Sequence, residues 1–504
     1  MLPPSAISRV TGVHVEPRNF NLGGAQFLPQ RLAVIGTGND DAVYDTKKHE
    51  ATGSADAIAQ RYGYGSPLHL AARQLFLDAG GGANFPVTFF PLQKANGSVA
   101  ATGAILCDGL PTATGSGIVR IGGIETEFAI IENHTPRQIL TALKERIAGR
   151  LEMPVITGPL NEEPWGNGET WGNGETWGAR AELPLVAKWS GDAGNDITIE
   201  IEMNAPGVVF GITNMAGGAV DPDVNQALGK IGQVWETFVL SCFSYRNQSR
   251  LNIFKTFGEG RWDEMEKMPC LVAHGCTDGF ETRTAISRQR KNDYINFLVP
   301  GVGSPEIPFV VAARGLVNIM RTANSNPALN DHGILTGLRA GPDEVQENYL
   351  TRNNSVNHGS STSIKIGNVI ALNDTITFWH PDNEAVKSRR YVVDAVRLMN
   401  IVFNIRLIME DPMMKGAPLV PDDNPTSNPR AIQPKTVRTA MMNLANALAT
   451  HAILATSEFT KENMTVQISS MNPKRLDIQF PCKLAGNIEV SSTDIFFGFY
   501  FGEA

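Results

Sequence analysis

The chain has 504 residues, more than one hydrophobic core normally holds, so we expect several domains. Apolar residues make up 42% and charged residues 19%, which is typical of a globular protein. The formal net charge is −8, and the longest basic cluster is the short one from Lys387 to Arg390, which argues against a nucleic-acid-binding protein.

The five cysteines form no CxxC motif, and an odd, sparse set predicts no disulfide framework. We therefore expect synthesis in a reducing cytoplasm. The first residues lack the apolar segment of a signal peptide, and no stretch of about 20 apolar residues exists that would insert directly into a membrane.

Residues 1–28 are interrupted by proline and glycine, and between the breaks Val13 and Val15 alternate with polar residues. This pattern predicts an extended N-terminal arm with strand character. A lone strand leaves its backbone groups unpaired, so the arm must join a sheet of its own chain or of a neighbour.

Residues 29–91 and 216–340 predict one α/β middle domain. A buried strand over 31–38 ends in a glycine turn, a helix follows with Ser66 as its cap and Pro67 at its first position, and a strand follows at 85–90. Further helices are expected at 261–267 and 278–298, and a strand at 269–276. The glycine turn lacks the third glycine and the following helix of a dinucleotide-binding loop.

Between these two parts, residues 92–215 predict an inserted β-rich domain with one helix capped by Thr135. Inside it a six-residue repeat places Trp165, Trp171 and Trp177 at equal spacing. Its glycine content is typical of a surface loop. Two interpretations remain open: an expanded loop, or an aromatic loop that contacts carbohydrate or a partner.

Residues 341–487 predict a C-terminal α/β domain. The pattern indicates a hairpin over 363–380 with Asn373 and Asp374 at its turn. Two long helices follow, one opening at Asp382 or Asn383 and one at Pro434, and then strands at 464–469, 475–480 and 487–490. The aromatic tail over 495–501 is an aggregation hazard unless it pairs with a sheet of its own domain or of a neighbour.

No catalytic, cofactor-binding or metal-binding pattern is present. The histidines form no HxH or HExxH motif, and neither a nucleophile elbow nor a phosphate-binding loop occurs. A zinc site built from Cys270, His274 and Cys276 would need a fourth ligand that the sequence does not supply. We therefore expect no enzyme activity and no cofactor.

Several segments resemble tail sheath proteins of contractile phage tails, the Mu-like branch in particular. These segments are residues 29–38, 55–75, 363–379, 391–394 and 472–480. The resemblance covers both ends of the chain and is weak in the middle. The fold class that we expect is a multidomain α/β (α+β) protein with an α/β core, a β-rich insert and a C-terminal sheath domain with exchanged terminal strands.

The resemblance implies a structural subunit that stacks in rings of six around a tail tube, with its C-terminal domain innermost. The implied partners are further copies of the chain, the tail tube, and baseplate and tail terminator proteins, with neither nucleic acid nor membrane insertion. The implied location is the virion tail, after assembly in the host cytoplasm. The alternatives are a related contractile injection device, or a carbohydrate-binding or hydrolytic component of the tail or baseplate.

The chain ends then carry the assembly function. We expect residues 488–504 to form a C-terminal arm. The residues expected in inter-subunit strands are Ile7, Val10, Val13, Val15, Ile488, Val490, Ile495, Phe497, Phe499 and Phe501. Gly23, Gly24 and Gly486 are the expected linkers, and Cys107 and Cys482 are candidate inter-subunit thiols, although a buried free cysteine is the more usual state.

Overall fold

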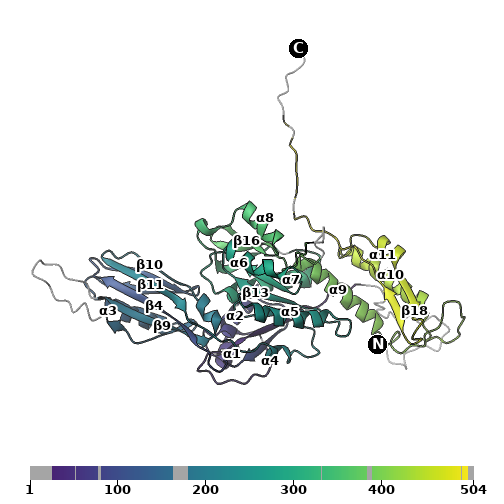
Figure 1. Cartoon of the computed structure of the whole chain (residues 1–504), viewed down its shortest axis with the longest axis horizontal. Coiled ribbons are helices and arrows are strands. Elements are labelled where there is room, and N and C mark those ends of the chain that lie inside the picture. Colours follow the sequence, from purple (N-terminus) through teal and green to yellow (C-terminus); the bar gives the residue numbers. More distant parts are fainter. Residues whose placement is uncertain are drawn as a thin grey trace, which may run out of the picture. The chain divides into compact units, whose positions relative to one another are not determined.

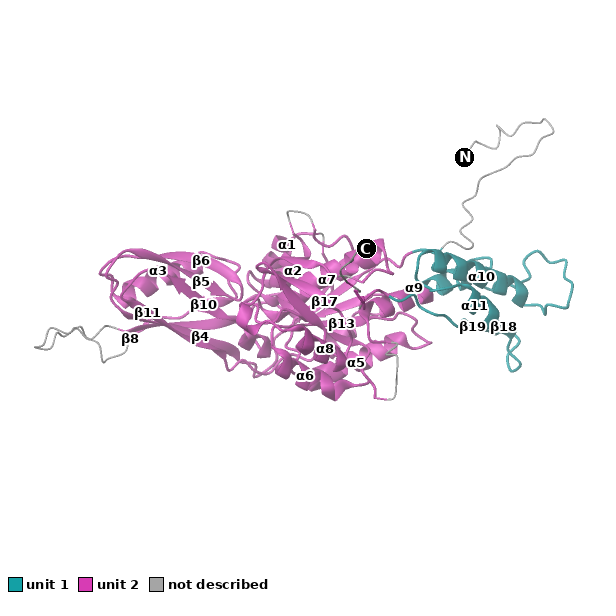
Figure 2. Ribbon diagram, turned by 90° about the horizontal axis from the view of Figure 1, so that it is seen from above, with its two compact units in different colours: residues 1–26, 403–486 teal, residues 27–402, 487–504 magenta. Residues whose placement is uncertain are grey.

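The computed structural model describes residues 25–51, 53–77, 81–162, 180–330, 332–382, 389–489, 491–495 and 497. The chain divides into two compact units (Figure 2). Unit 1 comprises Met1–Gln26 and Phe403–Gly486, and unit 2 comprises Phe27–Val402 and Asn487–Ala504. The boundary between the units falls within a helix, and the predicted five-part domain division stays a prediction.

A six-stranded sheet forms the centre of unit 2, in the order β14-β13-β12-β1-β3-β2. All neighbours are parallel except the short edge strand β2, which is antiparallel to β3. The strands are β1 (Leu32–Thr37), β2 (His49–Glu50), β3 (Val87–Leu92), β12 (Phe238–Ser241), β13 (Leu271–Cys276) and β14 (Asn296–Pro300). Every residue of the five parallel strands is buried, as expected of a sheet covered on both faces by helices.

Local signals start the helices that cover this sheet. The side chain of Ser54 caps α1 (Ala55–Tyr62), and Ser66 caps α2 (Pro67–Leu75), with Pro67 at the first helical position as predicted. The longest helix of this layer, α7 (Pro308–Ser325), is buried along most of its length and packs against α2 and β13 (Figure 1). Residues 225–228 form the short helix α4.

Two helix predictions in this part were wrong. The helix expected at 261–267 is instead α5 (Gln248–Trp262), which begins earlier. Its glycines obscure the helical pattern, but Gly258 is needed because an added Cβ would lie 2.2 Å from Ile295. The helix expected at 278–298 stops as α6 (Phe280–Ser287) and a 3-10 turn, because Asp293 accepts the N–H groups that lead into β14.

The insert predicted over 92–215 is β-rich, with a three-stranded sheet in the order β10-β5-β6 and a second sheet in the order β11-β4-β9-β7, with β8 paired to β9. The elements are β4 (Ala100–Gly109), β5 (Gly115–Ile121), β6 (Ile124–Ile130), α3 (Pro136–Ala148), β7 (Val155–Thr157), β8 (Asn161–Glu162), β9 (Ala181–Ser190), β10 (Ile199–Met203) and β11 (Val208–Ala216). Thr135 caps α3 in a complete capping box, and alternate residues of β9 are buried, as expected of strands with one covered face.

Charged groups tie the insert to the core sheet. Arg250 at the start of α5 is 5% exposed and forms ion pairs with Asp192 and Asp221, which follow β9 and β11. Arg246 bonds in the same way to Asp196 of the insert and to Asp278 after β13. Because a buried charge that loses its partner is costly, these pairs hold the insert against the core.

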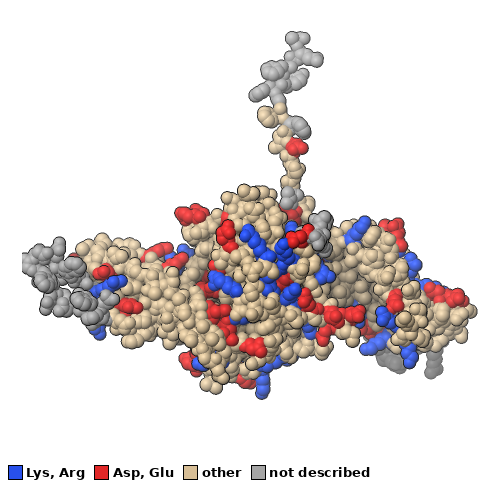
Figure 3. Space-filling model, viewed as in Figure 1, with Lys and Arg blue, Asp and Glu red and all other residues tan. Residues whose placement is uncertain are grey.

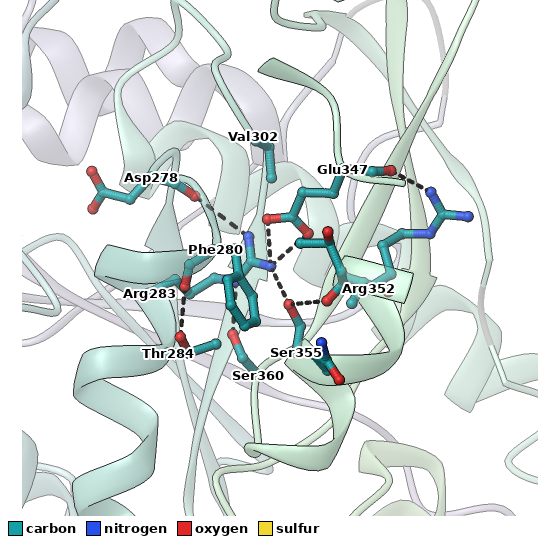
Figure 4. A network of polar contacts seen from close by, with 12 residues as sticks. Asp278, Phe280, Arg283, Thr284, Val302, Glu347, Arg352, Ser355 and Ser360 are labelled. Atoms are coloured by element: carbon teal, nitrogen blue, oxygen red, sulfur yellow. Dashed lines mark hydrogen bonds and ion pairs between the residues drawn. The ribbon is translucent and has the colours of Figure 1, made fainter. Parts of the chain in front are cut away.

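A second buried network ties α6 to α8 (Tyr349–Asn357) and to the loop after it (Figure 4). The guanidinium of Arg283, which is fully buried, donates to both carboxylate oxygens of Glu347 at 2.9 and 2.8 Å. It also donates to the hydroxyls of Ser355 and Ser360 at 2.9 and 2.8 Å. A charge buried to this degree is stable only because its donors are satisfied.

A three-stranded sheet in the order β15-β17-β16 completes unit 2, built from β15 (Ile334–Arg339), β16 (Thr362–Ile366) and β17 (Val369–Asp374). The predicted hairpin exists, but its turn is at Gly367 and Asn368, where Gly367 has a φ of 62°. Asn373 and Asp374 instead lie at the end of β17, and Asp374 pairs with Thr362. A two-residue loop that includes a positive φ suits a hairpin, and glycine adopts that φ without strain.

Helix α9 (Val392–Met409) contains the boundary between the units and begins later than predicted. The predicted starting residue Asn383 lies outside the described residues, and Asp382 is not helical. Unit 1 then contains α10 (Pro434–Thr450), α11 (Glu458–Asn463), β18 (Thr465–Ile468) and β19 (Leu476–Gln479). Helix α10 starts at Pro434 as predicted and packs its buried stripe near β18.

Candidate assembly surfaces

Residues just after Gly486 are fixed to unit 2 by side-chain hydrogen bonds. Arg397 on α9, which is 1% exposed, donates to Asn487 Oδ1 at 2.7 Å. Asn487 in turn donates to the carbonyl oxygen of Ala328 at 3.0 Å, and Asn330 donates to Glu489 Oε1 at 2.9 Å. These bonds anchor the start of the C-terminal segment at two alternate residues.

The described residues of this segment present large apolar side chains to solvent. Ile488 is 90% exposed, Ile495 80% and Phe497 92%. None of the three lies in a strand, and the strand expected over 487–490 is absent among its described residues 487–489. Fully burying each such side chain would contribute about 1.5–3 kcal/mol. A segment that is anchored at its start and exposes these apolar side chains is suited to binding another molecule.

The remaining residues predicted for inter-subunit strands and linkers lie outside the described residues. They are Ile7, Val10, Val13, Val15, Gly23, Gly24, Val490, Phe499 and Phe501. The third predicted linker, Gly486, is the last residue of the second segment of unit 1, and an added Cβ there would meet nothing within 4 Å.

The first described residues of the chain, which belong to no helix or strand, lie against α9. Asn404 exchanges two hydrogen bonds with the backbone of Gln26, each 2.8 Å long. One turn earlier, Asn400 Oδ1 accepts the N–H of Leu28 at 2.8 Å. Both asparagine side chains are almost fully buried, so each takes the place of a neighbouring strand for one residue of the N-terminal segment.

Sequence reasoning missed these anchoring residues. Arg397, Asn400 and Asn404 follow one another at spacings of three and four, and so lie on one face of α9. A polar stripe of this kind on an otherwise apolar helix is a signal that the helix binds backbone or charge along that face.

The two-stranded sheet of unit 1 offers two strand edges. Strands β18 and β19 pair with each other from Thr465–Gln479 to Ile468–Leu476. In the described part of the chain, neither strand pairs with a third. Half-buried Val466 and Ile478 lie opposite each other in this register. An exposed strand edge presents unpaired N–H and C=O groups that a further strand can join.

The two candidate inter-subunit thiols differ in their exposure to solvent. Cys107 in β4 is fully buried, and burial raises its pKa to about 12. Cys482 in unit 1 is only partly buried, and burial raises the pKa of its thiol as well. Both are free in this structure, and inter-subunit pairing stays a prediction for which Cys482 is the more accessible residue.

Two places in the sequence suggested a chemical site, the glycine turn after β1 and the segment around His274. In the structure, side chains of the chain itself fill both. At the glycine turn after β1, Tyr44 donates to the Leu92 carbonyl and accepts from Gly38 N–H, and an added Cβ at Gly38 would lie 2.5 Å from its ring. The buried His274 interacts with Asn296 at 3.0 Å, and burial lowers the pKa of His274 to about 3. Within the described ranges, no group of three His, Cys, Asp or Glu residues is arranged to hold a metal ion.

Acidic and basic side chains are interspersed on the face drawn in Figure 3. A nucleic-acid-binding face would instead concentrate one sign of charge. A search of the described helices finds none that is long and apolar enough to cross a bilayer.

An anchored, uncovered apolar segment and a small sheet with open edges are together typical of proteins that assemble by adding strands to one another. The sequence is 23% identical over 404 residues to a Mu-like prophage FluMu tail sheath protein of Haemophilus influenzae. The aligned region covers 77% of this chain and 77% of the relative. This relative confirms the predicted resemblance to Mu-like tail sheath proteins.

No family model matches the chain. Among solved structures, a sheath tail protein from Listeria innocua aligns with a TM-score of 0.48 at 11% identity, over 92% of this chain and 94% of its own. A sheath tail protein from Desulfitobacterium hafniense aligns with a TM-score of 0.43 at 10% identity, over 92% and 93%.

Proposed function

We propose that this chain is a structural subunit of a contractile phage tail sheath. In this proposal, copies stack as rings of six around a tail tube, and contraction of the stack drives the tube through the host envelope during genome delivery. The chain acts in the virion tail after assembly in the host cytoplasm, and it contacts the tail tube, the baseplate and the tail terminator. The sequence relationship to a tail sheath protein supports this role.

The observation that carries the proposal is the C-terminal segment. Its start is held by Arg397 and Asn330, whereas Ile495 and Phe497 beyond it are almost fully exposed. Apolar side chains that their own chain leaves in water are typical of a surface that binds another molecule. In this proposal a neighbouring subunit buries them.

The sheet formed by β18 and β19 is the acceptor that we propose for the exchanged strands. Both edges of this sheet are open in the described chain, and an incoming strand would satisfy backbone groups along either edge. Residues 5–16 and 488–501 of neighbouring copies are the incoming strands in this proposal. Strand addition depends on backbone pairing, so it tolerates the diffuse apolar sequence of both arms.

Linkers let the arms stay paired while subunits rotate. Gly23 and Gly24 follow the N-terminal arm in the sequence, and Gly486 joins unit 1 to the anchored start of the C-terminal segment. Glycine permits backbone rotation with little steric cost, so these positions absorb a rigid-body movement. The energy for contraction is then stored in the extended assembly, and no nucleotide needs to be hydrolysed.

Deletion of the arms tests the proposal. The full chain is purified beside a variant lacking residues 1–24 and a variant lacking residues 490–504, and each is imaged by negative-stain electron microscopy. We expect tubes or stacked rings from the full chain, and folded, unpolymerised protein from both deletions. Tubes formed by both deletion variants would show that the arms are not the joints, and a full chain that never polymerises would contradict the sheath function itself.

A further inference from the structure

The contact between the insert and the core at Arg250 contains more carboxylates than it can neutralise. Arg250 lies on α5 of the core, whereas Asp192 lies in the insert and Asp221 follows the last strand of the insert, β11. Both carboxylates form ion pairs with Nη2 of Arg250, which is 3.3 Å from Asp192 Oδ2. One guanidinium neutralises one carboxylate, so the fully ionised cluster keeps a surplus negative charge.

This surplus charge is largely removed from water. The side chains of Arg250 and Asp221 are each 6% exposed, and that of Asp192 is 28% exposed. The N–H of Asp192 donates to Asp221 Oδ1 at 3.0 Å, but Asp192 Oδ1 is buried and accepts no hydrogen bond within the described chain. A proton held by either carboxyl group would remove the surplus charge and supply a donor between the two groups.

The same imbalance occurs at a second contact between the insert and the core. Arg246 forms ion pairs with Asp196 of the insert and with Asp278 of the core, whose Oδ2 atom also accepts the hydroxyl of Tyr245 at 2.5 Å. Asp196 and Asp192 share one 3-10 turn and repel each other. Arg246 is 42% exposed, so water screens this contact more than the one at Arg250.

We propose that the contact between the insert and the core is controlled by protons: it is tight while Asp192 and Asp221 share a proton, and it loosens as the second carboxyl group ionises. When the contact opens, both carboxyl groups reach water and release the shared proton. Opening therefore becomes easier as the pH rises. This inference concerns the insert alone and does not depend on whether the chain polymerises.

The pH range of the effect follows from Asp221. Burial, and after it the neighbouring carboxyl group of Asp192, raises the pKa of Asp221 to about 7 from an ordinary value of 3.8. Between these two values the closed contact holds a proton that the open contact does not hold, so the closed contact loses stability as the pH rises. Above about 7 neither form holds the proton, and the dependence on pH ends.

The backbone amide of Asp40 reports whether the contact is closed. Asp40 follows β1 of the core, and its N–H donates to the carbonyl oxygen of Lys188 in β9 at 2.9 Å. Hydrogen exchange at this amide is followed by mass spectrometry on the full chain from pH 5 to 8, and each rate is corrected for the intrinsic effect of pH. Because exchange requires this hydrogen bond to open, the corrected rate measures opening of the contact.

Four proteins are compared, all carrying Glu306→Gln, because Glu306 also touches the insert and titrates in the same range. They are this reference, Asp221→Asn, Asp192→Asn, and Asp223→Asn as the control at an exposed carboxyl nearby. In the reference and the control, we expect protection of the Asp40 amide to fall about tenfold between pH 5 and 7.5 and then to level off. Asp221→Asn and Asp192→Asn each remove the surplus charge, so protection should stay constant.

A reference protein whose protection does not change with pH would overturn the inference. So would a fall of the same size in either asparagine variant, because the titrating group would then lie elsewhere. Thermal unfolding shows whether both variants fold, and one folded variant is sufficient because the two changes remove the same charge.

Discussion

At the scale of single residues, this protein places full charges inside its core and surrounds them with partners. Arg283 is the deepest case, with a bidentate carboxylate and two hydroxyls as acceptors (Figure 4). Such an arrangement specifies one packing of α6 against α8, because any other leaves a charge buried without a partner.

Replacing Arg283 by methionine is expected to cost about 3–5 kcal/mol of unfolding free energy, because Glu347 then remains buried and unpaired. Urea unfolding of the arm-deleted chain measures this change. Arg288→Met provides the matched control, since Arg288 is exposed on the same stretch of chain. Similar losses in the two variants would show that the network does not stabilise the fold.

Glu306 predicts how stability depends on pH. It precedes α7, is 7% exposed and lies against Gly123 of the insert, and burial raises the pKa of its carboxyl to about 7. The folded chain therefore holds a proton that the unfolded chain releases near its ordinary pKa of about 4.5, so stability falls as the pH rises from there to about 7.

Glu306→Gln removes this titration. We expect the variant to gain stability relative to wild type as the pH rises from about 5 to 7.5, with no further gain above that range. Melting temperatures across this pH series provide the measurement. A difference between the two proteins that stays constant with pH would show that Glu306 is ionised throughout.

At the scale of elements, α9 binds the backbone of a segment that forms neither helix nor strand. Two residues of a strand advance about 6.6 Å, and four residues of a helix advance about 6 Å. The spacing of Asn400 and Asn404 therefore matches that of Leu28 and Gln26, and each asparagine meets the next inward-facing backbone group.

Replacing both asparagines by alanine is expected to release the N-terminal segment without unfolding α9, because the segment loses its side-chain partners while the backbone hydrogen bonds of the helix remain. Hydrogen exchange at the Gln26 and Leu28 amides should become about tenfold faster or more. Asn443→Ala on the exposed face of α10 is the control. Unchanged exchange at both amides would mean that other contacts hold the segment.

At the scale of the whole molecule, the tryptophan repeat separates the two functional interpretations. Trp165, Trp171 and Trp177 lie outside the described residues, so their predicted place in a surface loop stays a prediction. If the chain is a sheath subunit, changing all three to alanine leaves polymer formation intact, because the proposed joints are the terminal arms. Electron microscopy and a glycan array on both proteins measure the two properties. Tight glycan binding that disappears in the triple variant would favour the carbohydrate-binding alternative.

Much of the local structure was predictable because its signals are local. Ser66 with Pro67 and Thr135 with Pro136 start their helices as predicted, and the buried apolar runs of β1 and β13 form parallel strands. The errors occurred where a distant residue decides. Gly258 within α5 is explained only by Ile295, which packs against it.

By itself, the sequence determined many of the elements, the absence of recognisable catalytic motifs and the resemblance to tail sheath proteins, because capping, periodicity and motifs act over a few residues. Only the tertiary structure decided which polar residues matter. Asn400, Asn404 and Arg397 acquire their partners from segments far away in the chain. Burial and long-range pairing depend on the whole fold, so no short stretch of sequence encodes them.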